Sequence, residues 1–188
     1  MDTNDATFDR LLTAYRDGDA GALDGLVPLV YEDLRRIARR QARAGRGLTI
    51  DTTALVHEAY LKMADQSRLD ARDRGHLLAI CARAMRQFMV SHARERQADK
   101  RGGGARQTTL GNALVSSEAE ADQLILVDQA LERLGMLDER LVKVFECRYF
   151  AGLSEQETAE ALDQSLRTVQ RDWMRARAWL REWLEADR

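Results

Sequence analysis

Apolar residues recur every three or four positions along most of the chain, which is the spacing of one face of an α-helix. No segment alternates apolar and polar residues in the way that a half-buried β-strand does. Residues 21 to 45 are the clearest example, because their apolar face stands opposite a face of arginines. That apolar face consists of Leu26, Leu29, Val30, Leu34, Ile37 and Ala38. The chain of 188 residues has a single proline, Pro28, so few positions oppose helix formation. The pattern predicts an all-α fold.

Breaks in this periodicity divide the chain into predicted helices. They cover residues 6 to 16, 21 to 45, 52 to 65, 74 to 98, 122 to 134, 138 to 150, 154 to 162 and 166 to 185. Residues 102 to 121 are rich in glycine, then polar, then acidic, which is typical of a flexible linker. We therefore expect two small helical domains, residues 1 to 101 and 122 to 188, joined by the linker.

The charges are unevenly distributed, although the net charge is only -2. Basic residues concentrate in residues 83 to 101 and again in residues 166 to 181, while the acidic stretch 116 to 122 lies between them. Two basic regions separated by an acidic one indicate two candidate surfaces for an anionic partner.

Cys81 and Cys147 lie within apolar helical patterns and have no neighbouring Cys or His at zinc-ligand spacing. They are predicted to be buried, reduced thiols.

The first residues are acidic and polar, unlike a signal peptide, and no apolar stretch approaches the roughly 20 residues that a membrane-spanning helix needs. We expect a cytoplasmic protein without membrane association.

His57 and Glu58 stand together in a helical pattern, as in the zinc-protease motif. That motif requires a second histidine where this chain has Leu61, so a metal site is not expected. The sequence shows no pairing of a nucleophile with a base and no phosphate-binding loop. We expect neither enzymatic activity nor a bound metal or cofactor.

A pair of capped helices begins at Ser154, which is a favourable N-cap and forms a capping box with Glu157. A short turn containing Asp163 follows, and Ser165 can cap the next helix. Ala159 supplies a small residue where the two helices must cross. The pattern predicts a helix-turn-helix, whose second helix enters the major groove of DNA.

The second helix of this pair separates an apolar face from a face rich in arginine. The residues expected to face the core are Leu166, Val169, Trp173, Ala176 and Leu180. The residues expected to face DNA are Arg167, Thr168, Gln170, Arg171 and Arg175. Arginine can read guanine and glutamine can read adenine, while further arginines neutralise phosphates.

The order and spacing of these segments resemble the bacterial RNA polymerase sigma factors of the extracytoplasmic-function class. Residues 51 to 64 are similar to the segment of that family that binds core polymerase. Residues 85 to 102 resemble the helix that melts and reads the downstream promoter element. Residues 137 to 180 resemble the domain that reads the upstream element. The resemblance covers nearly the whole chain.

The resemblance implies that the protein directs promoter-specific initiation by core RNA polymerase, with promoter DNA as its second partner. The residues implied to meet the polymerase clamp helices are Asp51, Leu55, Glu58 and Lys62. The residues implied to approach the downstream element are Gln87, Ser91, His92 and Arg94. The DNA-facing residues of the last helix would read the upstream element.

The start of the polymerase-binding helix departs from the pattern of the family. Related sigma factors carry an acidic cluster there, whereas this chain keeps only Asp51, followed by Thr52, Thr53 and Ala54. One interpretation is that these residues serve as N-caps. The other is that a serine/threonine kinase phosphorylates Thr52 or Thr53 and thereby restores the negative charge. The sequence leaves both open, and an anti-sigma factor is the alternative regulator.

Two other functions fit the same C-terminal pattern. The first is a stand-alone helix-turn-helix regulator whose N-terminal domain senses a signal or dimerises. The second is a regulatory adaptor that binds a kinase or an anti-sigma partner without productive DNA contact. Binding to core polymerase separates the sigma factor from the regulator.

Overall fold

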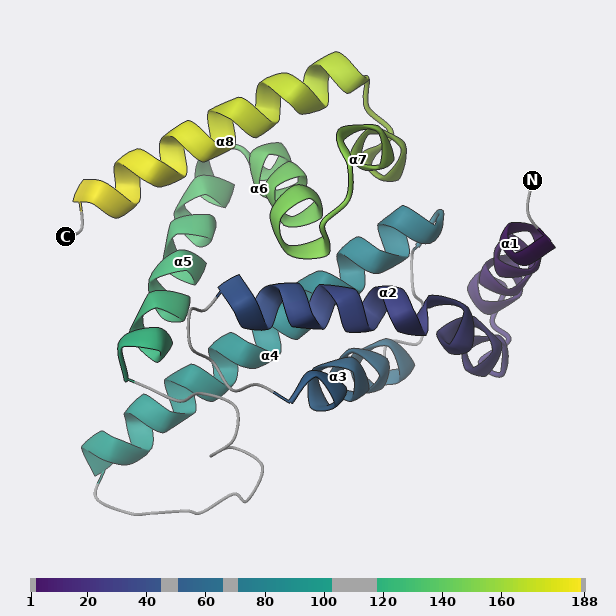
Figure 1. Ribbon diagram of the computed structural model, residues 1–188, viewed down its shortest axis with the longest axis horizontal. Helices are drawn as coiled ribbons and strands as arrows, with labels where there is room; N and C mark the ends of the chain where they lie inside the picture. Colours follow the sequence, from purple (N-terminus) through teal and green to yellow (C-terminus); the bar gives the residue numbers. More distant parts are fainter. Residues whose placement is uncertain (1–2, 45–50, 66–70, 103–117, 187–188) are drawn as a thin grey trace.

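The computed structural model describes residues 3–44, 51–65, 71–102 and 118–186, and all regular secondary structure in these ranges is helical (Figure 1). In chain order the elements are α1 (Thr3–Arg16), α2 (Ala22–Ala44), α3 (Thr52–Asp65), α4 (Arg74–Gly102), α5 (Glu118–Leu137), α6 (Glu139–Phe145), the π-helical segment η2 (Glu146–Ala151), α7 (Glu155–Leu162) and α8 (Leu166–Ala186). The predicted all-α fold is confirmed.

The stretch predicted as a linker is shorter than expected at both ends. α4 continues to Gly102, and α5 begins at Glu118 rather than at residue 122. Alanine and glutamate favour helix, and acidic side chains stabilise a helix N-terminus, so residues 118 to 121 extend α5. The rest of the predicted linker, residues 103 to 117, lies outside the described residues.

The helices pack in two groups that share α4. In the first group α2 contacts α1, α3 and α4, and in the second group α8 contacts α5, α6 and α7. α4 packs against α5, η2 and α7 as well as against α2 and α3. Figure 1 shows α2 lying along α4, while α8 crosses the opposite side of the molecule above α5 and α6. α4 therefore makes most of the contacts between the two groups, and Arg40 of α2 adds a hydrogen bond to the Tyr149 carbonyl of η2 at 2.8 Å.

The hydrophobic core confirms the periodicity seen in the sequence. On α2 the side chains of the predicted apolar face are buried, apart from the half-buried Leu29. The largest completely buried side chains include Phe8, Leu26, Leu34, Ile37, Leu55, Leu77, Met85 and Leu134. Burying one such side chain contributes about 1.5–3 kcal/mol, so the core stabilises both groups of helices.

Both cysteines lie in this core, as predicted. Neither Cys81 nor Cys147 forms a disulfide, and burial raises the pKa of each thiol to about 12. Both thiols therefore remain protonated at neutral pH and are poor nucleophiles.

Within the described ranges, no helix combines the length and the apolar character needed to span a membrane.

A buried ionic cluster connects α4 to the second group of helices. Arg86 of α4 is only 6% exposed. Its guanidinium donates to Asp128 of α5 and, at 2.8 Å, to Glu146 of η2. The same guanidinium lies 5.6 Å from the centre of the Phe150 ring. Arg94, two turns further along α4, donates to the second Asp128 oxygen at 2.9 Å. The cluster compensates two buried carboxylates with the charges of two arginines.

Replacement of Arg86 by methionine tests the weight of this cluster. The variant keeps the length of the side chain but leaves Asp128 and Glu146 buried without their main cation. We expect its free energy of unfolding, measured by urea denaturation, to fall by about 3 kcal/mol. Arg83→Met is the matched control, because Arg83 is half exposed and lies 4.0 Å from Glu146. It should lose less than about 1 kcal/mol. Equal losses of unfolding free energy in the two variants would contradict the conclusion that Arg86 is the main cation of the buried cluster.

Candidate nucleic-acid interface

α7 begins with the capping box that the sequence predicts. Ser154 has extended backbone angles, and its hydroxyl accepts a hydrogen bond from the Glu157 N–H at 3.1 Å. The Glu157 carboxylate accepts in return from the Ser154 N–H at 2.6 Å. These hydrogen bonds with Ser154 lower the pKa of the Glu157 carboxyl. The first turn of α7 is thus fixed by local contacts.

The turn between α7 and α8 has the predicted form. Asp163 adopts the left-handed conformation, with φ 52° and ψ 51°, and its N–H closes the end of α7. The Ser165 hydroxyl then accepts from the Thr168 N–H at 3.1 Å, which caps α8. Ala159 is buried where α7 approaches α8 and packs with Val169. α7 and α8 therefore form two short-linked, capped helices that cross closely.

The buried face of α8 differs from the predicted one at its first residue, Leu166. Val169, Ala176 and Leu180 are buried and Trp173 is half-buried, as the periodicity predicts. The prediction for Leu166 was wrong, because its side chain is 40% exposed. Leu166 is the first residue of α8, so no earlier turn of its own helix lies beneath its side chain.

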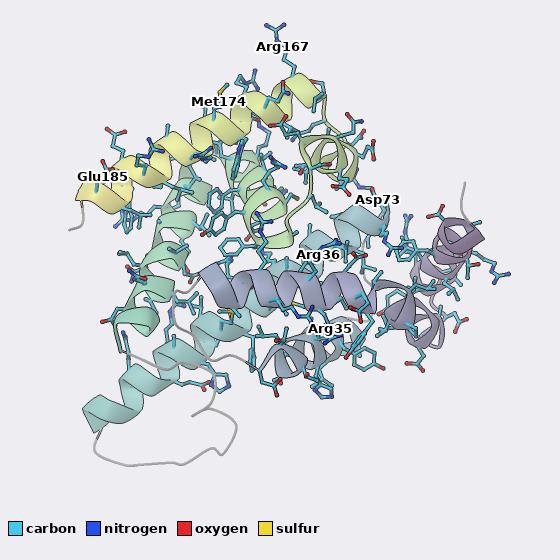
Figure 2. The ribbon with its side chains drawn as sticks, in the orientation of Figure 1. Arg35, Arg36, Asp73, Arg167, Met174 and Glu185 are labelled. Carbon is cyan, nitrogen blue, oxygen red and sulfur yellow. The ribbon has the colours of Figure 1, made fainter. Side chains whose placement is uncertain are left out.

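Most residues predicted to face DNA lie on the exposed side of α8. The exposed ones are Arg167, Gln170, Arg171 and Arg175. Thr168 is half-buried, and its hydroxyl lies 2.8 Å from that of Ser165. Gln170 donates to Glu155 of α7 at 2.9 Å. Figure 2 shows Arg167 projecting outward from the N-terminal end of α8, away from the other helices.

A buried aspartate, which the apolar periodicity of α8 does not predict, lies beneath these arginines. Asp172 is fully buried, and its Oδ1 accepts from Arg171 Nε at 3.1 Å. The same oxygen lies 3.8 Å from Arg175 Nη1, and Oδ2 lies 3.7 Å from Arg140 Nη2 of α6. The buried Asp172 carboxylate thus contacts three half-exposed guanidinium groups, two on α8 and one on α6. The spacing of Asp172 from Arg175, three residues on, is the signal that could have suggested this pairing.

On the other side of α8, the Trp173 ring contacts Arg177 of the same helix and Arg148 of η2. The guanidinium of Arg177 lies 5.4 Å from the centre of the Trp173 ring, and that of Arg148 lies 5.5 Å from it. Such contacts orient a cation over a ring without consuming its hydrogen-bond donors. α8 therefore carries oriented arginines on both of its sides.

Hydrogen bonds at the start of α3 identify the residue that caps this helix. Asp51 Oδ1 accepts from the Thr53 N–H at 2.9 Å, and the Asp51 carbonyl accepts from the Leu55 N–H at 3.2 Å. Asp51 is therefore the N-cap, and the hydroxyl groups of Thr52 and Thr53 are not needed for that role. Thr53 is exposed and Thr52 is half-buried.

The surface implied to meet polymerase must be corrected at one position. Leu55 is completely buried, because it belongs to the apolar stripe of α3 and cannot reach a partner. Asp51 is exposed and Glu58 is half-buried. Leu61 is 44% exposed and extends the same surface, as the helical spacing predicts. The side chain of Lys62 lies outside the described residues.

The residues implied to meet the downstream element differ in their availability. Gln87 and Ser91 are exposed on α4. His92 is half-buried, with its ring edge-on to that of Phe88 at 4.8 Å. Arg94 is bound by Asp128 and lies 3.7 Å from Glu132, so acidic groups of α5 occupy its guanidinium in this arrangement.

Among the side chains that the structure describes, no group of three His, Cys, Asp or Glu residues could hold a metal ion.

Comparison with known proteins gives a family for this arrangement. The sequence model of the family described as "ECF sigma factor" matches residues 5–186. The solved structure described as "Structure of CnrH in complex with the cytosolic domain of CnrY" contains a chain that is 21% identical to this one, with a TM-score of 0.41. That match covers 97% of this chain and 99% of the other. None of the curated proteins matched.

Substitution of Asp163 tests the left-handed turn between α7 and α8. Asp163→Gly should leave the free energy of unfolding within about 0.5 kcal/mol of the original, since glycine adopts this conformation without steric cost. Asp163→Val should lower it by roughly 1–2 kcal/mol, because a β-branched side chain collides with its own backbone there. Thermal unfolding followed by circular dichroism measures both. A valine variant as stable as the glycine variant would show that the turn is not left-handed.

Proposed function

Because the chain belongs to the ECF sigma factor family, we propose that it binds core RNA polymerase and directs it to promoters whose upstream element is read by α8. The observation that carries this proposal is the exposed face of α8, which follows a capped turn and bears Arg167, Gln170 and Arg171. The chemistry of RNA synthesis is that of polymerase. The protein supplies the DNA contacts that select the start site.

The proposed binding functions are divided between the two groups of helices. We assign polymerase binding and the downstream element to α1–α4, and the upstream element to α5–α8. Arg167 and Gln170 are the base-reading candidates, because their side chains can make two hydrogen bonds to guanine or adenine. Arg171 and Arg175, positioned by Asp172, are suited to phosphates. Thr168 completes the upstream surface next to the Ser165 cap.

Contact with the downstream element requires a rearrangement. Gln87, Ser91 and His92 remain the candidates on α4 together with Arg94. Arg94 can reach DNA only when its ion pairs with Asp128 and Glu132 break. We infer that assembly with polymerase separates α4 from α5 and thereby releases this guanidinium. A melted strand then meets a basic helix end rather than a neutralised one.

The polymerase contact lies at the start of α3. We assign it to Asp51, Glu58 and Lys62, with the exposed Leu61 as an apolar neighbour. The first turn of α3 contains no acidic residue. Since Asp51 already caps the helix, phosphorylation of Thr52 or Thr53 would add negative charge without removing a cap. We propose that a serine/threonine kinase acts here to strengthen polymerase binding; an anti-sigma factor would act at the same step by blocking it.

Loss of the Arg167 side chain should separate DNA reading from polymerase binding. We expect Arg167→Ala to lower promoter-specific transcription by reconstituted polymerase at least about fivefold, which corresponds to the lower end of the roughly 1–3 kcal/mol of a bidentate base contact. Co-purification with core polymerase should be unchanged. Arg10→Ala, an exposed arginine on α1, is the control and should behave as the original protein. A protein that binds duplex DNA alone and never co-purifies with polymerase would instead be a stand-alone regulator.

Charge at the start of α3 is tested by substitution with glutamate. We expect Thr52→Glu or Thr53→Glu to bind core polymerase more tightly than the unmodified protein, since an acidic side chain in the first turn is favoured by the helix dipole and replaces the missing charge. The matched Thr→Ala variants should bind like the unmodified protein. Affinity measured by fluorescence titration decides the matter, and no gain in either glutamate variant would exclude the phosphorylation switch.

A further inference from the structure

One apolar side chain stands exposed in the middle of the polar face of α8. Met174 is 66% exposed, and its neighbours on that face are Gln170, Arg171, Arg177 and the small Ala178. We propose that Met174 reads a thymine in the upstream promoter element, by packing its thioether against the 5-methyl group of that base. The inference rests on the proposed function, because it assumes that α8 enters the major groove.

Helix geometry places Met174 in line with Arg167. Seven residues make nearly two turns of an α-helix, so the two side chains leave the axis only about 20° apart. Figure 2 shows both residues projecting outward from the same side of α8, away from the helices beneath. If Arg167 meets the edge of a base, Met174 therefore points toward the floor of the same groove.

The arginines on either side of Met174 indicate how the helix sits between the DNA strands. Arg175 and Arg177 leave the axis of α8 in directions roughly 160° apart, with Met174 between them. Arg175 lies 3.8 Å from the buried Asp172 carboxylate, and Arg177 lies over the Trp173 ring. A helix in the major groove passes between two rows of phosphates, and oriented cations on its two sides can meet both rows. The residue between them is then directed at the bases.

The chemistry of methionine selects among the base edges in the groove. Its thioether donates no hydrogen bond and accepts only weakly, so it would leave the polar groups of guanine, cytosine or adenine unpaired. Thymine is the base that presents a methyl group in the major groove. A flexible, polarisable side chain adapts its packing to such a methyl group. Met174 thus favours thymine by apolar contact and disfavours other bases by desolvation.

The spacing along the helix also predicts where this thymine lies. The seven residues from Arg167 to Met174 span about 10.5 Å at 1.5 Å per residue. Base pairs are stacked about 3.4 Å apart. With α8 lying along the groove, the thymine should stand about three base pairs from the pair that Arg167 contacts.

The experiment uses polymerase holoenzyme assembled with the full chain and a promoter selected by that holoenzyme from random DNA. Each thymine of the upstream element is replaced singly by deoxyuridine, which removes the methyl group and nothing else. Competition binding should show that one replacement, about three base pairs from the site protected by Arg167, weakens binding roughly fourfold, as expected for one methyl group. Met174→Ala holoenzyme should bind the thymine and uracil promoters equally.

Met136→Ala is the matched control, because Met136 is 81% exposed at the end of α5, away from the exposed face of α8. It should discriminate thymine from uracil as the original protein does. The inference is overturned if Met174→Ala keeps the discrimination, if no thymine responds, or if the selected element has none at that distance. If Arg167→Ala weakens binding while Met174 has no effect, this inference alone fails. If Arg167→Ala also has no effect, the assignment of α8 to the upstream element fails with it.

Discussion

The guanidinium of Arg86 links the two groups of helices by pairing with two buried carboxylates, those of Asp128 and Glu146. Asp128 and Glu146 are both buried and belong to α5 and η2, while Arg86 and Arg94 belong to α4. Burying charges is costly unless each is paired, so this cluster stabilises one arrangement of the helices strongly and tolerates departures from it poorly. Asp128 of the same cluster also pairs with Arg94. On the proposed function, this compact arrangement opposes contact between Arg94 and downstream DNA.

The exposed face of α8 depends on a second set of buried groups. Asp172 anchors arginines on one side of the helix and Trp173 anchors them on the other. Each anchor reduces the conformational freedom that a long side chain would lose on binding DNA. The capping box at Ser154 and the left-handed turn at Asp163 fix the position of α8 itself. The candidate interface therefore depends on groups outside it. The caps fix the position of α8, the buried groups orient its arginines, and Met174 lies between those arginines.

Local features could be predicted from the sequence, because they depend on neighbours in the chain. The capping box, the Asp163 turn and the apolar stripes of α2 and α8 all involve residues three or four positions apart, or a single residue's backbone preference. The burial of Arg86 could not be predicted in this way, since its partners lie 42 and 60 residues away. Leu55 was ambiguous in the sequence. The apolar periodicity indicated the core, whereas the family resemblance indicated a surface that meets polymerase. Its side chain is packed in the core. The burial of Asp172 was not predicted, because the spacing to Arg175 suggests an ion pair but does not show that the carboxylate lies in the core beside Arg140 of α6.

Footprinting of promoter DNA tests the central claim most directly, because it reports polymerase dependence, upstream reading and downstream melting in one experiment. Core polymerase with the protein should protect an upstream segment and make thymines of a downstream segment reactive to permanganate, which modifies unpaired bases. Neither component alone should do so, since on the proposed function the chain supplies the DNA contacts and assembly with polymerase separates α4 from α5. Protection of the upstream segment by the protein alone, unchanged on addition of polymerase and without downstream melting, would contradict the account.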